Sequence, residues 1–295
     1  MLPAKLNRIY SKSNQYQQAV QLVQQLQNSG YAAYLVGGCV RDLLLGVEPK
    51  DYDIATEADS DVVRHIFPEA RGYGRSFGVS ILRYQDFTIE IAAFRQDGPY
   101  YDHRRPAWVK IGTLEEDAWR RDFTVNALYY APQQDELVDP VSGRQDLEAR
   151  ILRVIGDPFE RLDEDWLRLL RAVRFAARFA LRFDYRTWDA LRVLAPFVSG
   201  VVAERRTAEI RLMLTNPRCG RALGLLFSSG LWEALWPDLP FSPKRMRKVI
   251  AQLKQIRKKV EIWKAFFCDL PEEIVFESAR DLRLMRKEKQ ELGIP

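Results

Sequence analysis

Three carboxylates in the first third of the chain have the spacing of a cation site. Asp51 and Asp53 lie two residues apart in a strand-like segment, so their side chains share one face. Glu90 lies in a second strand-like segment, where Ile89 and Ile91 point to the opposite face. Neighbouring carboxylates repel each other unless a cation lies between them, and Mg²⁺ prefers oxygen ligands. Taken alone, such residues also fit a turn or an exposed strand edge.

A glycine pair precedes the two aspartates. Gly37 and Gly38 separate a short apolar run from a helix-like segment that ends at Gly46. Between a strand and a helix, glycines let the backbone approach a phosphate, and the helix N-terminus offers free N–H groups. Most glycine pairs only mark tight turns, but the nearby Asp51 and Asp53 favour a phosphate-binding role.

The elements that would position these residues change character near residue 150. Before it, apolar alternation predicts strands at 31–36, 52–55, 79–84 and 87–94, together with short strands in 137–155 and helices at 14–28 and 115–130. From Asp163 onward every strong pattern is helical. We therefore predict an α+β fold with a small mixed or antiparallel sheet, divided into a head (1–150), a helical neck (151–215) and a short helical body (216–295).

Composition excludes several classes of protein. The chain of 295 residues has 47% hydrophobic residues, enough for a full core, and no run of about 18 apolar residues that would span a membrane. Cys39, Cys219 and Cys268 are far apart and odd in number, which indicates a reducing, cytoplasmic setting. With only His65 and His103 present, neither a zinc site nor a Ser-His-Asp hydrolase has support.

The positive charge is concentrated at the C-terminal end. The chain has a net charge of +5, yet residues 241–295 contain 14 Lys and Arg against 8 Asp and Glu. A polyanionic partner such as RNA would bind this surface through its phosphates, and an ordinary solvated helix face is the alternative. The cations at the start of the segment that we expect to contact RNA are Lys244, Arg245, Arg247 and Lys248.

Several ordered motifs together resemble one enzyme family. The stretch YLVGGCVRDLLLGVEPKDYDIAT resembles the signature of the DNA polymerase β-like nucleotidyltransferase superfamily. More narrowly it is similar to the class II tRNA nucleotidyltransferases, the group of CCA-adding enzymes and bacterial poly(A) polymerases. Residues 120–128 (RRDFTVNAL), 139–147 (DPVSGRQDL) and 163–179 (DEDWLRLLRAVRFAARF) resemble the family's ribose-recognition, head-to-neck and neck-helix motifs, in the family's order.

The resemblance implies a mechanism and a set of site residues. It implies that Asp51 and Asp53 bind two Mg²⁺ ions, with Glu90 as the third catalytic carboxylate. It also implies that Asp165 and Arg168 act as a protein template for CTP and ATP. The residues that it assigns to nucleotide binding are Gly37, Gly38, Arg41, Arg121, Asp122, Asn126, Asp165, Arg168, Arg171 and Arg174.

The neck-helix motif has a physical interpretation beside the resemblance. Asp165 and Arg168 are three residues apart in a predicted helix, so we expect both side chains on one face, where they match the hydrogen-bonding edge of a base. The alternative is an ordinary surface ion pair. Arg171, Arg174 and Arg178 fall on one side of the same helix and suit either phosphate contact or a solvated face. Asp122 and Asn126 would likewise lie one helical turn apart.

The loop at residues 97–112 bears on the product. The resemblance implies that enzymes adding the terminal adenosine keep a loop here, so we expect addition of CCA to the 3′ end of a tRNA from CTP and ATP. Addition of A alone, poly(A) synthesis, a catalytically silent RNA-binding protein and transfer to a small molecule remain alternatives. The oligomeric state is not predicted.

Two departures from the family's pattern stand out. The family's neck ends in Glu-Arg-aliphatic-x-x-Glu, and here Arg206 takes the aliphatic place between Arg205 and Glu209. The family also typically continues through a longer helical body, so the chain is expected to be naturally short or truncated. We therefore expect the basic segment 244–264 to carry much of the RNA contact.

Overall fold

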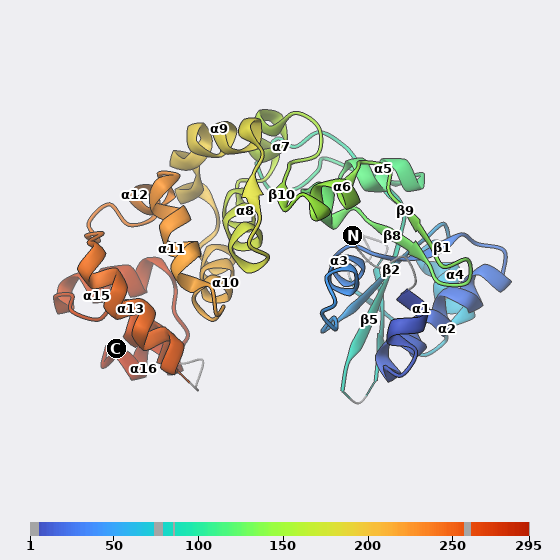
Figure 1. Ribbon diagram of the computed structural model, residues 1–295, viewed down its shortest axis with the longest axis horizontal. Coiled ribbons are helices and arrows are strands. Elements are labelled where there is room, and N and C mark those ends of the chain that lie inside the picture. The colour runs from blue at the N-terminus through green and yellow to red at the C-terminus, as the bar shows by residue number, and fades with distance from the viewer. Residues whose placement is uncertain (1–5, 74–78, 85, 257–260, 295) are drawn as a thin grey trace. The chain divides into compact units, whose positions relative to one another are not determined.

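A computed structural model describes residues 6–73, 79–84, 86–256 and 261–294 (Figure 1). The chain divides into two compact units, of which the first contains residues 1–101 and 105–156 and the second contains residues 102–104 and 157–295. Among the described residues, none of the helices combines the length and the apolar character that a membrane crossing requires. The expected α+β class, with a helical C-terminal part, is confirmed.

The first unit is built on a mixed seven-stranded sheet in the order β3-β4-β5-β2-β1-β8-β9 (Figure 1). Only β2 and β5 pair in parallel, and the other neighbours are antiparallel. The strands of this unit are β1 Ala33–Val36, β2 Tyr52–Thr56, β3 Arg71–Tyr73, β4 Val79–Arg83, β5 Thr88–Ala93, β6 Arg95–Asp97, β7 Val109–Ile111, β8 Tyr129–Ala131, β9 Glu136–Val138 and β10 Ile151–Leu152.

Helices cover both faces of the sheet. Helix α2 packs against β1 and β2, where the Tyr16 ring meets Tyr52 edge-on at 6.3 Å between centroids. On the other face Ala55, Ala118 and Tyr129 belong to one buried apolar cluster. The helices of this unit are α1 Leu6–Tyr10, α2 Asn14–Asn28, α3 Gly38–Leu44, α4 Ser60–Ile66, α5 Leu114–Trp119, the 3₁₀ helix η1 Thr124–Asn126 and α6 Gly143–Glu148.

Two local predictions in this unit are wrong. The helix expected at 115–130 ends at Trp119, because residues 120–123 turn away and Asn126 closes a 3₁₀ turn instead. Helix α6 interrupts the stretch expected to hold only short strands. A Cβ at Gly143, the first residue of α6, would lie 2.1 Å from the carbonyl oxygen of Thr124, so α6 and η1 pack too closely for any side chain there.

The second unit is helical apart from the short strand β11, Arg182–Phe183. Its core is rich in aromatic residues, with Trp232, Trp263 and Phe266 fully buried. On α8, Leu169 and Val173 are buried in this core. The helices are α7 Pro158–Glu164, α8 Leu167–Arg178, α9 Tyr185–Leu194, η2 Ala195–Gly200, α10 Ala203–Leu214, α11 Cys219–Ser228, α12 Leu231–Leu235, α13 Pro243–Gln255, α14 Ile262–Phe266, α15 Glu272–Asp281 and α16 Arg286–Leu292.

Candidate active site

Asp53 and Glu90 lie directly opposite each other on adjacent strands. The parallel pairing of β2 with β5 places Asp53 in register with Glu90, and Ile54 in register with Ile91. Glu90 is exposed and Ile91 is buried, as alternation along the strand predicts. Asp51 is exposed and immediately precedes β2. The structure therefore brings the carboxylates of Asp53 and Glu90 side by side on one face of the sheet. Asp51 lies two residues before Asp53 in the chain.

The electrostatics of this cluster fit a cation. Burial, followed by the negative charge of Glu90, raises the pKa of Asp53 to about 6, with Asp51 adding to the rise and Arg121 opposing it. Within the described part of the chain, no three His, Cys, Asp or Glu side chains converge closely enough to hold a metal ion. Mg²⁺ commonly takes only one or two protein carboxylates and completes its shell with water and substrate phosphate oxygens, so this donor set suits it.

Gly37 makes the predicted turn at the end of β1. Its φ of 75° and ψ of −125° lie where other residues are strained, and its N–H donates to the carbonyl of Leu128 at 2.9 Å. A Cβ here would lie 3.1 Å from Nη1 of Arg121. Gly38 then begins α3, so the backbone turn and a guanidinium meet at the same end of the sheet as Asp53.

A buried aspartate that the sequence analysis did not single out holds Arg121 in place. Asp117 on α5 is 1% exposed and accepts hydrogen bonds from Arg121 (2.8 Å), Arg120 and the hydroxyl of Tyr129 (2.6 Å). Burial alone would raise the pKa of Asp117, but Arg121 and Arg120 hold it at about 2. Asp117 lies three and four residues before the two arginines, and this spacing could have identified the ion pairs from the sequence.

The remaining predicted nucleotide-binding residues of this unit form one buried hydrogen-bonded group. Nδ2 of Asn126 donates to Asp122 at 3.0 Å, and Oδ1 of Asn126 accepts from Arg41. Arg41 also donates to Asp42 at 2.6 Å and 2.9 Å. Asp122 and Asn126 therefore contact each other as expected, although a 3₁₀ turn rather than an α-helix brings them together.

In the second unit the expected geometry of Asp165 and Arg168 is wrong. Asp165 lies between α7 and α8 in extended conformation, with φ −146° and ψ 101°, and its side chain accepts from the N–H of Leu167 at 3.1 Å. Asp165 therefore lies before the start of α8, whose first residue is Leu167, and is not part of that helix. Asp165 and Arg168 thus do not share one helical face.

Each member of the expected template pair has another partner. Arg205 on α10 donates to both oxygens of Asp165, at 3.1 Å and 2.9 Å. Arg168 is buried and donates to Glu164 at 2.7 Å. Neither Arg205 nor Glu164 was among the predicted site residues. Arg205 is 40 residues from Asp165 and cannot be found from local spacing, whereas Glu164 is four residues from Arg168, so its spacing was an available signal.

The arginine stripe of α8 is only partly a surface feature. Arg174 forms an ion pair with Glu209 of α10, and both side chains are largely buried. Arg171 and Arg178 lie over the rings of Phe175 and Phe179 respectively, at 5.2 Å and 4.7 Å from the centroids. Arg174 therefore has a structural role in this unit beside its expected nucleotide contact.

The tip of the predicted loop belongs to the second unit. Strands β6 and β7 form a two-stranded ribbon, and residues 102–104 at its tip cluster with residues 157–295. The ring of His103 stacks on Trp166 at 4.0 Å between centroids with an angle of 11°. Nε1 of Trp166 donates to Asp163 at 2.9 Å. The tip of the loop is thus held against Trp166, the residue that follows Asp165.

The four predicted RNA-contacting cations on α13 differ in exposure. Lys244, Arg247 and Lys248 are exposed, and Lys248 pairs with Asp269 at 2.6 Å. Arg245 is buried, and its guanidinium donates to the main-chain carbonyls of residues 266 and 268. The inward side of α13 therefore uses Arg245 for packing, which leaves three cations for an external partner. Residues 257–260 of the basic segment lie outside the described residues.

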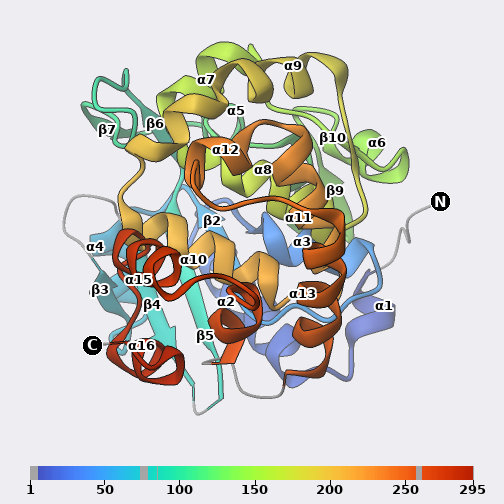
Figure 2. The ribbon, with the colours of Figure 1, turned by 90° about the vertical axis from the view of Figure 1, so that its left-hand side faces the viewer.

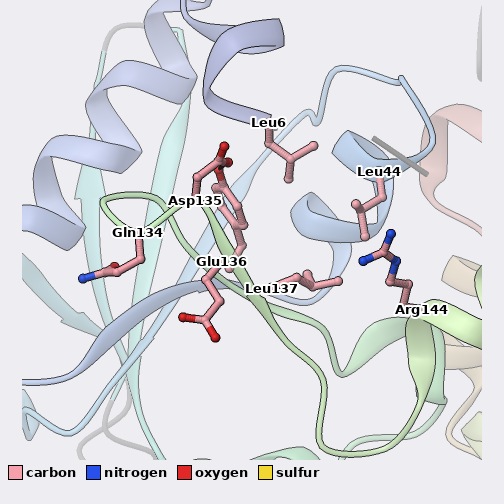
Figure 3. A pocket seen from close by; sticks show the side chains of 8 residues that line it. Leu6, Leu44, Gln134, Asp135, Glu136, Leu137 and Arg144 are labelled. Carbon is pink, nitrogen blue, oxygen red and sulfur yellow. Dashed lines mark hydrogen bonds between the residues drawn. The ribbon is translucent and has the colours of Figure 1, made fainter. Parts of the chain in front are cut away.

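A pocket elsewhere in the first unit is separate from these residues (Figure 3). It is lined by side chains from α1, α3, β8–β9 and α6, including Leu6, Leu44, Tyr130 and Arg144. None of the predicted catalytic or nucleotide-binding residues lines it. We assign no part of the candidate active site to this pocket.

Two family models match parts of the chain. Residues 33–153 match the Poly A polymerase head domain, and residues 180–241 match the probable RNA and SrmB-binding site of polymerase A. A CCA-adding enzyme of Geobacillus thermodenitrificans is 41% identical over 237 residues, which are 80% of this chain and 58% of that protein. Poly(A) polymerase I of Haemophilus influenzae is 39% identical over 234 residues, with 75% and 51% covered.

A solved structure extends the similarity over most of the fold. The crystal structure of the Bacillus stearothermophilus CCA-adding enzyme in complex with CTP matches with a TM-score of 0.69 and 31% identity, covering 92% of this chain and 70% of that one. The chain spans little more than half the length of the two curated relatives named above. Because the head-domain model, the ordered motifs and this solved structure all match, the chain belongs to the family of class II tRNA nucleotidyltransferases and bacterial poly(A) polymerases.

Proposed function

We propose that the protein adds nucleotides to the 3′ end of a tRNA without a nucleic-acid template, completing a CCA end from CTP and ATP. The observation that carries the proposal is the register of Asp53 with Glu90 beside Arg121, in a chain of this family. The B. stearothermophilus relative binds CTP, which supports a nucleoside triphosphate as substrate. The free cysteines Cys39 and Cys219 are consistent with a reducing, cytoplasmic setting.

The proposed reaction is in-line attack of the RNA 3′-hydroxyl on the α-phosphate, with release of pyrophosphate. Asp51 and Asp53 would hold two Mg²⁺ ions, with Glu90 beside them. When bound, these ions would lower the pKa of the attacking hydroxyl and neutralise charge on the triphosphate. Arg121, already oriented by Asp117, would hold phosphate oxygens without reorganisation on binding.

Choice of base is assigned to the second unit. Asp165 offers carboxylate oxygens to an exocyclic amine, which cytosine and adenine both carry. Its two hydrogen bonds with Arg205 orient the carboxylate. Arg168, held by Glu164, supplies donors near the start of α8. The loop tip anchored at His103 supports the terminal adenosine step, as the resemblance implies.

Primer extension on three tRNA transcripts, ending before CCA, after C and after CC, tests the function. With CTP and ATP supplied singly and together, we expect addition of C, C and A, after which growth stops. Addition of A to the CC-ended transcript alone would identify an A-adding enzyme, and long A tracts on any RNA would identify a poly(A) polymerase. An absence of incorporation with Mg²⁺ or Mn²⁺ would refute the proposed reaction.

We propose that the exposed cations of α13 contact the RNA backbone. Changing Lys244, Arg247 and Lys248 together to Gln should weaken tRNA binding and lower the slope of log K against log salt by about 2 to 3. Binding measured across a salt series gives both quantities. Changing Arg64 and Arg83, exposed cations outside both α13 and residues 180–241, is the matched control. An unchanged slope in the triple variant would return α13 to an ordinary solvated face.

A further inference from the structure

Helix α10 has polar side chains on two opposite sides. At about 100° per residue, Arg205 and Glu209 lie within one narrow sector of the helix. Arg206, Thr207 and Arg211 fall on the rest of its circumference, centred opposite that sector. The first sector faces the start and middle of the neck helix, since Arg205 binds Asp165 and Glu209 binds Arg174 in ion pairs.

The opposite side of α10 forms hydrogen bonds with the C-terminal helices α15 and α16 (Figure 2). The hydroxyl of Thr207 donates to the carbonyl of Leu282 at 2.6 Å. Arg211 donates to both oxygens of Glu288 at 3.0 Å, and Glu288, which is 1% exposed, also accepts from Trp263 at 2.9 Å. Because these partners are buried, the contacts fix where α10 lies against residues 282–288.

Arg206, the residue that departs from the family's aliphatic pattern, makes the central contact of this set. Its Nη2 donates to both oxygens of Asp281 at 2.9 Å, and its Nη1 donates to the carbonyl of Ser199 at 3.0 Å. The Arg206 side chain is 7% exposed and that of Asp281 is 51% exposed. A buried guanidinium needs such a partner, so the pair ties α10 to the end of α15.

The Ser199 contact extends this connection toward Asp165. Ser199 belongs to η2, whose Phe197 ring stacks on Trp166 at 5.4 Å. A Cβ at Gly200 would lie 2.6 Å from the Trp166 ring, so η2 and Trp166 pack in close contact. Trp166 is the neighbour of Asp165 in the chain. Arg206 therefore touches η2, which supports the Asp165 segment, and it is also the neighbour of Arg205, which binds Asp165.

We propose that Arg206 and Asp281 form a brace through which the C-terminal helices position Asp165 for base recognition. Arg206 is a positioning residue in this scheme, because it acts through Arg205 and η2 and does not meet the nucleotide. The inference rests on the proposed function for the role of Asp165. It assigns α15 and α16 a part in nucleotide binding that is independent of any contact with RNA.

Two changes to the full chain test the brace. Asp281→Asn removes the charge at a half-exposed position, and Arg206→Leu restores an aliphatic residue without leaving a buried charge. Equilibrium dissociation constants for CTP and for ATP, measured without RNA, should rise roughly 3- to 10-fold in both variants. In primer extension KM should rise to the same extent while kcat stays within about twofold. Asp281→Glu, which keeps the carboxylate, should restore wild-type values.

Arg283→Gln is the matched control for this experiment. Arg283 is two residues from Asp281 and also pairs with α10, through Glu204, but both of those side chains are more than half exposed. Breaking such a pair should leave nucleotide affinity unchanged. Thermal melting of each variant sets an assay temperature well below every unfolding transition, which excludes global unfolding as the cause.

The outcomes separate the brace from the proposed function. Wild-type affinities in both Asp281→Asn and Arg206→Leu, or an equal loss in Arg283→Gln, would overturn the brace while leaving the function intact. Wild-type protein that binds CTP and ATP but extends no tRNA would refute the function, and the affinity comparison would still decide the brace. Wild-type protein that binds neither nucleotide would overturn both.

Discussion

An Asp53→Asn variant is expected to lose nucleotidyl transfer by on the order of 10³-fold or more. Burial, followed by the negative charge of Glu90, raises the pKa of Asp53 to about 6. The amide keeps the size of the side chain but cannot offer two anionic oxygens to a divalent cation. Single-turnover incorporation of CMP and AMP measures the loss.

The same variant should not be less stable than the wild type. At neutral pH the ionised Asp53 is repelled by Glu90 and Asp51, so its replacement removes an unfavourable interaction from the folded state. Without metal, the melting temperature should stay equal or rise. Adding Mg²⁺ or Mn²⁺ should raise the melting temperature of the wild type and have little effect on the variant.

A carboxylate away from the cluster gives the control for this experiment. Asp61 on α4 is exposed and forms an ion pair with the exposed Arg64, so Asp61→Asn should keep wild-type activity and the wild-type response to metal. Activity of Asp53→Asn within about tenfold of the wild type would remove Asp53 from the catalytic assignment.

The second large effect is expected from Asp117→Asn, which should lower the free energy of unfolding by about 3–5 kcal/mol. Asp117 is 1% exposed and is shared by Arg120, Arg121 and Tyr129. Its replacement leaves two guanidinium groups inside the protein without their compensating charge. Urea unfolding at neutral pH measures the change, and nucleotide binding should weaken as well because Arg121 loses its orientation.

The pH dependence of the free energy of unfolding shows whether the ionised Asp117 carboxylate is what stabilises the fold. Its pKa is about 2 in the folded protein and 3.8 without the fold's influence, so the carboxylate stabilises the fold fully above about pH 4. This contribution is lost as the pH falls from 4 toward 2. The wild type should therefore lose stability faster than Asp117→Asn in that window.

Glu115→Gln is the matched control for Asp117. Glu115 lies on the same helix and is exposed, so its neutralisation should change the free energy of unfolding by less than about 0.5 kcal/mol. Equal stability of Asp117→Asn and wild type would show that Arg120 and Arg121 find other partners, and that the buried pairing does not hold the site together.

Much of the head's site was predictable from local pattern. Alternation placed Glu90 on the opposite face from Ile89 and Ile91, and the structure confirms this orientation. The turn at Gly37 was likewise predictable, because few residues other than glycine adopt its φ of 75°. Local pattern does not show which strands lie next to each other in the sheet. The pairing of β2 with β5 passes over β3 and β4 in the chain and depends on long-range contacts.

Predictions failed where partners come from different elements. Periodicity continued through residues 115–130, but Asp117 draws Arg120 and Arg121 back toward α5 and the chain turns after Trp119. The concentration of positive charge in the sequence also grouped Arg245 with its exposed neighbours as an RNA contact. Its guanidinium instead donates to carbonyls near the end of α14, which only the packing of α13 against that segment provides.

The sequence by itself determined the family, the strand faces of Asp53 and Glu90, and the division into a mixed sheet followed by helices. These features depend on residue types, on motif order and on periods of 2 and 3.6, all of which are local. Only the tertiary structure decided that Asp165 pairs with Arg205 and that Arg206 pairs with Asp281. Ion pairs across 40 and 75 residues are set by how the helices pack, and a charge in the sequence does not reveal which distant charge will neutralise it.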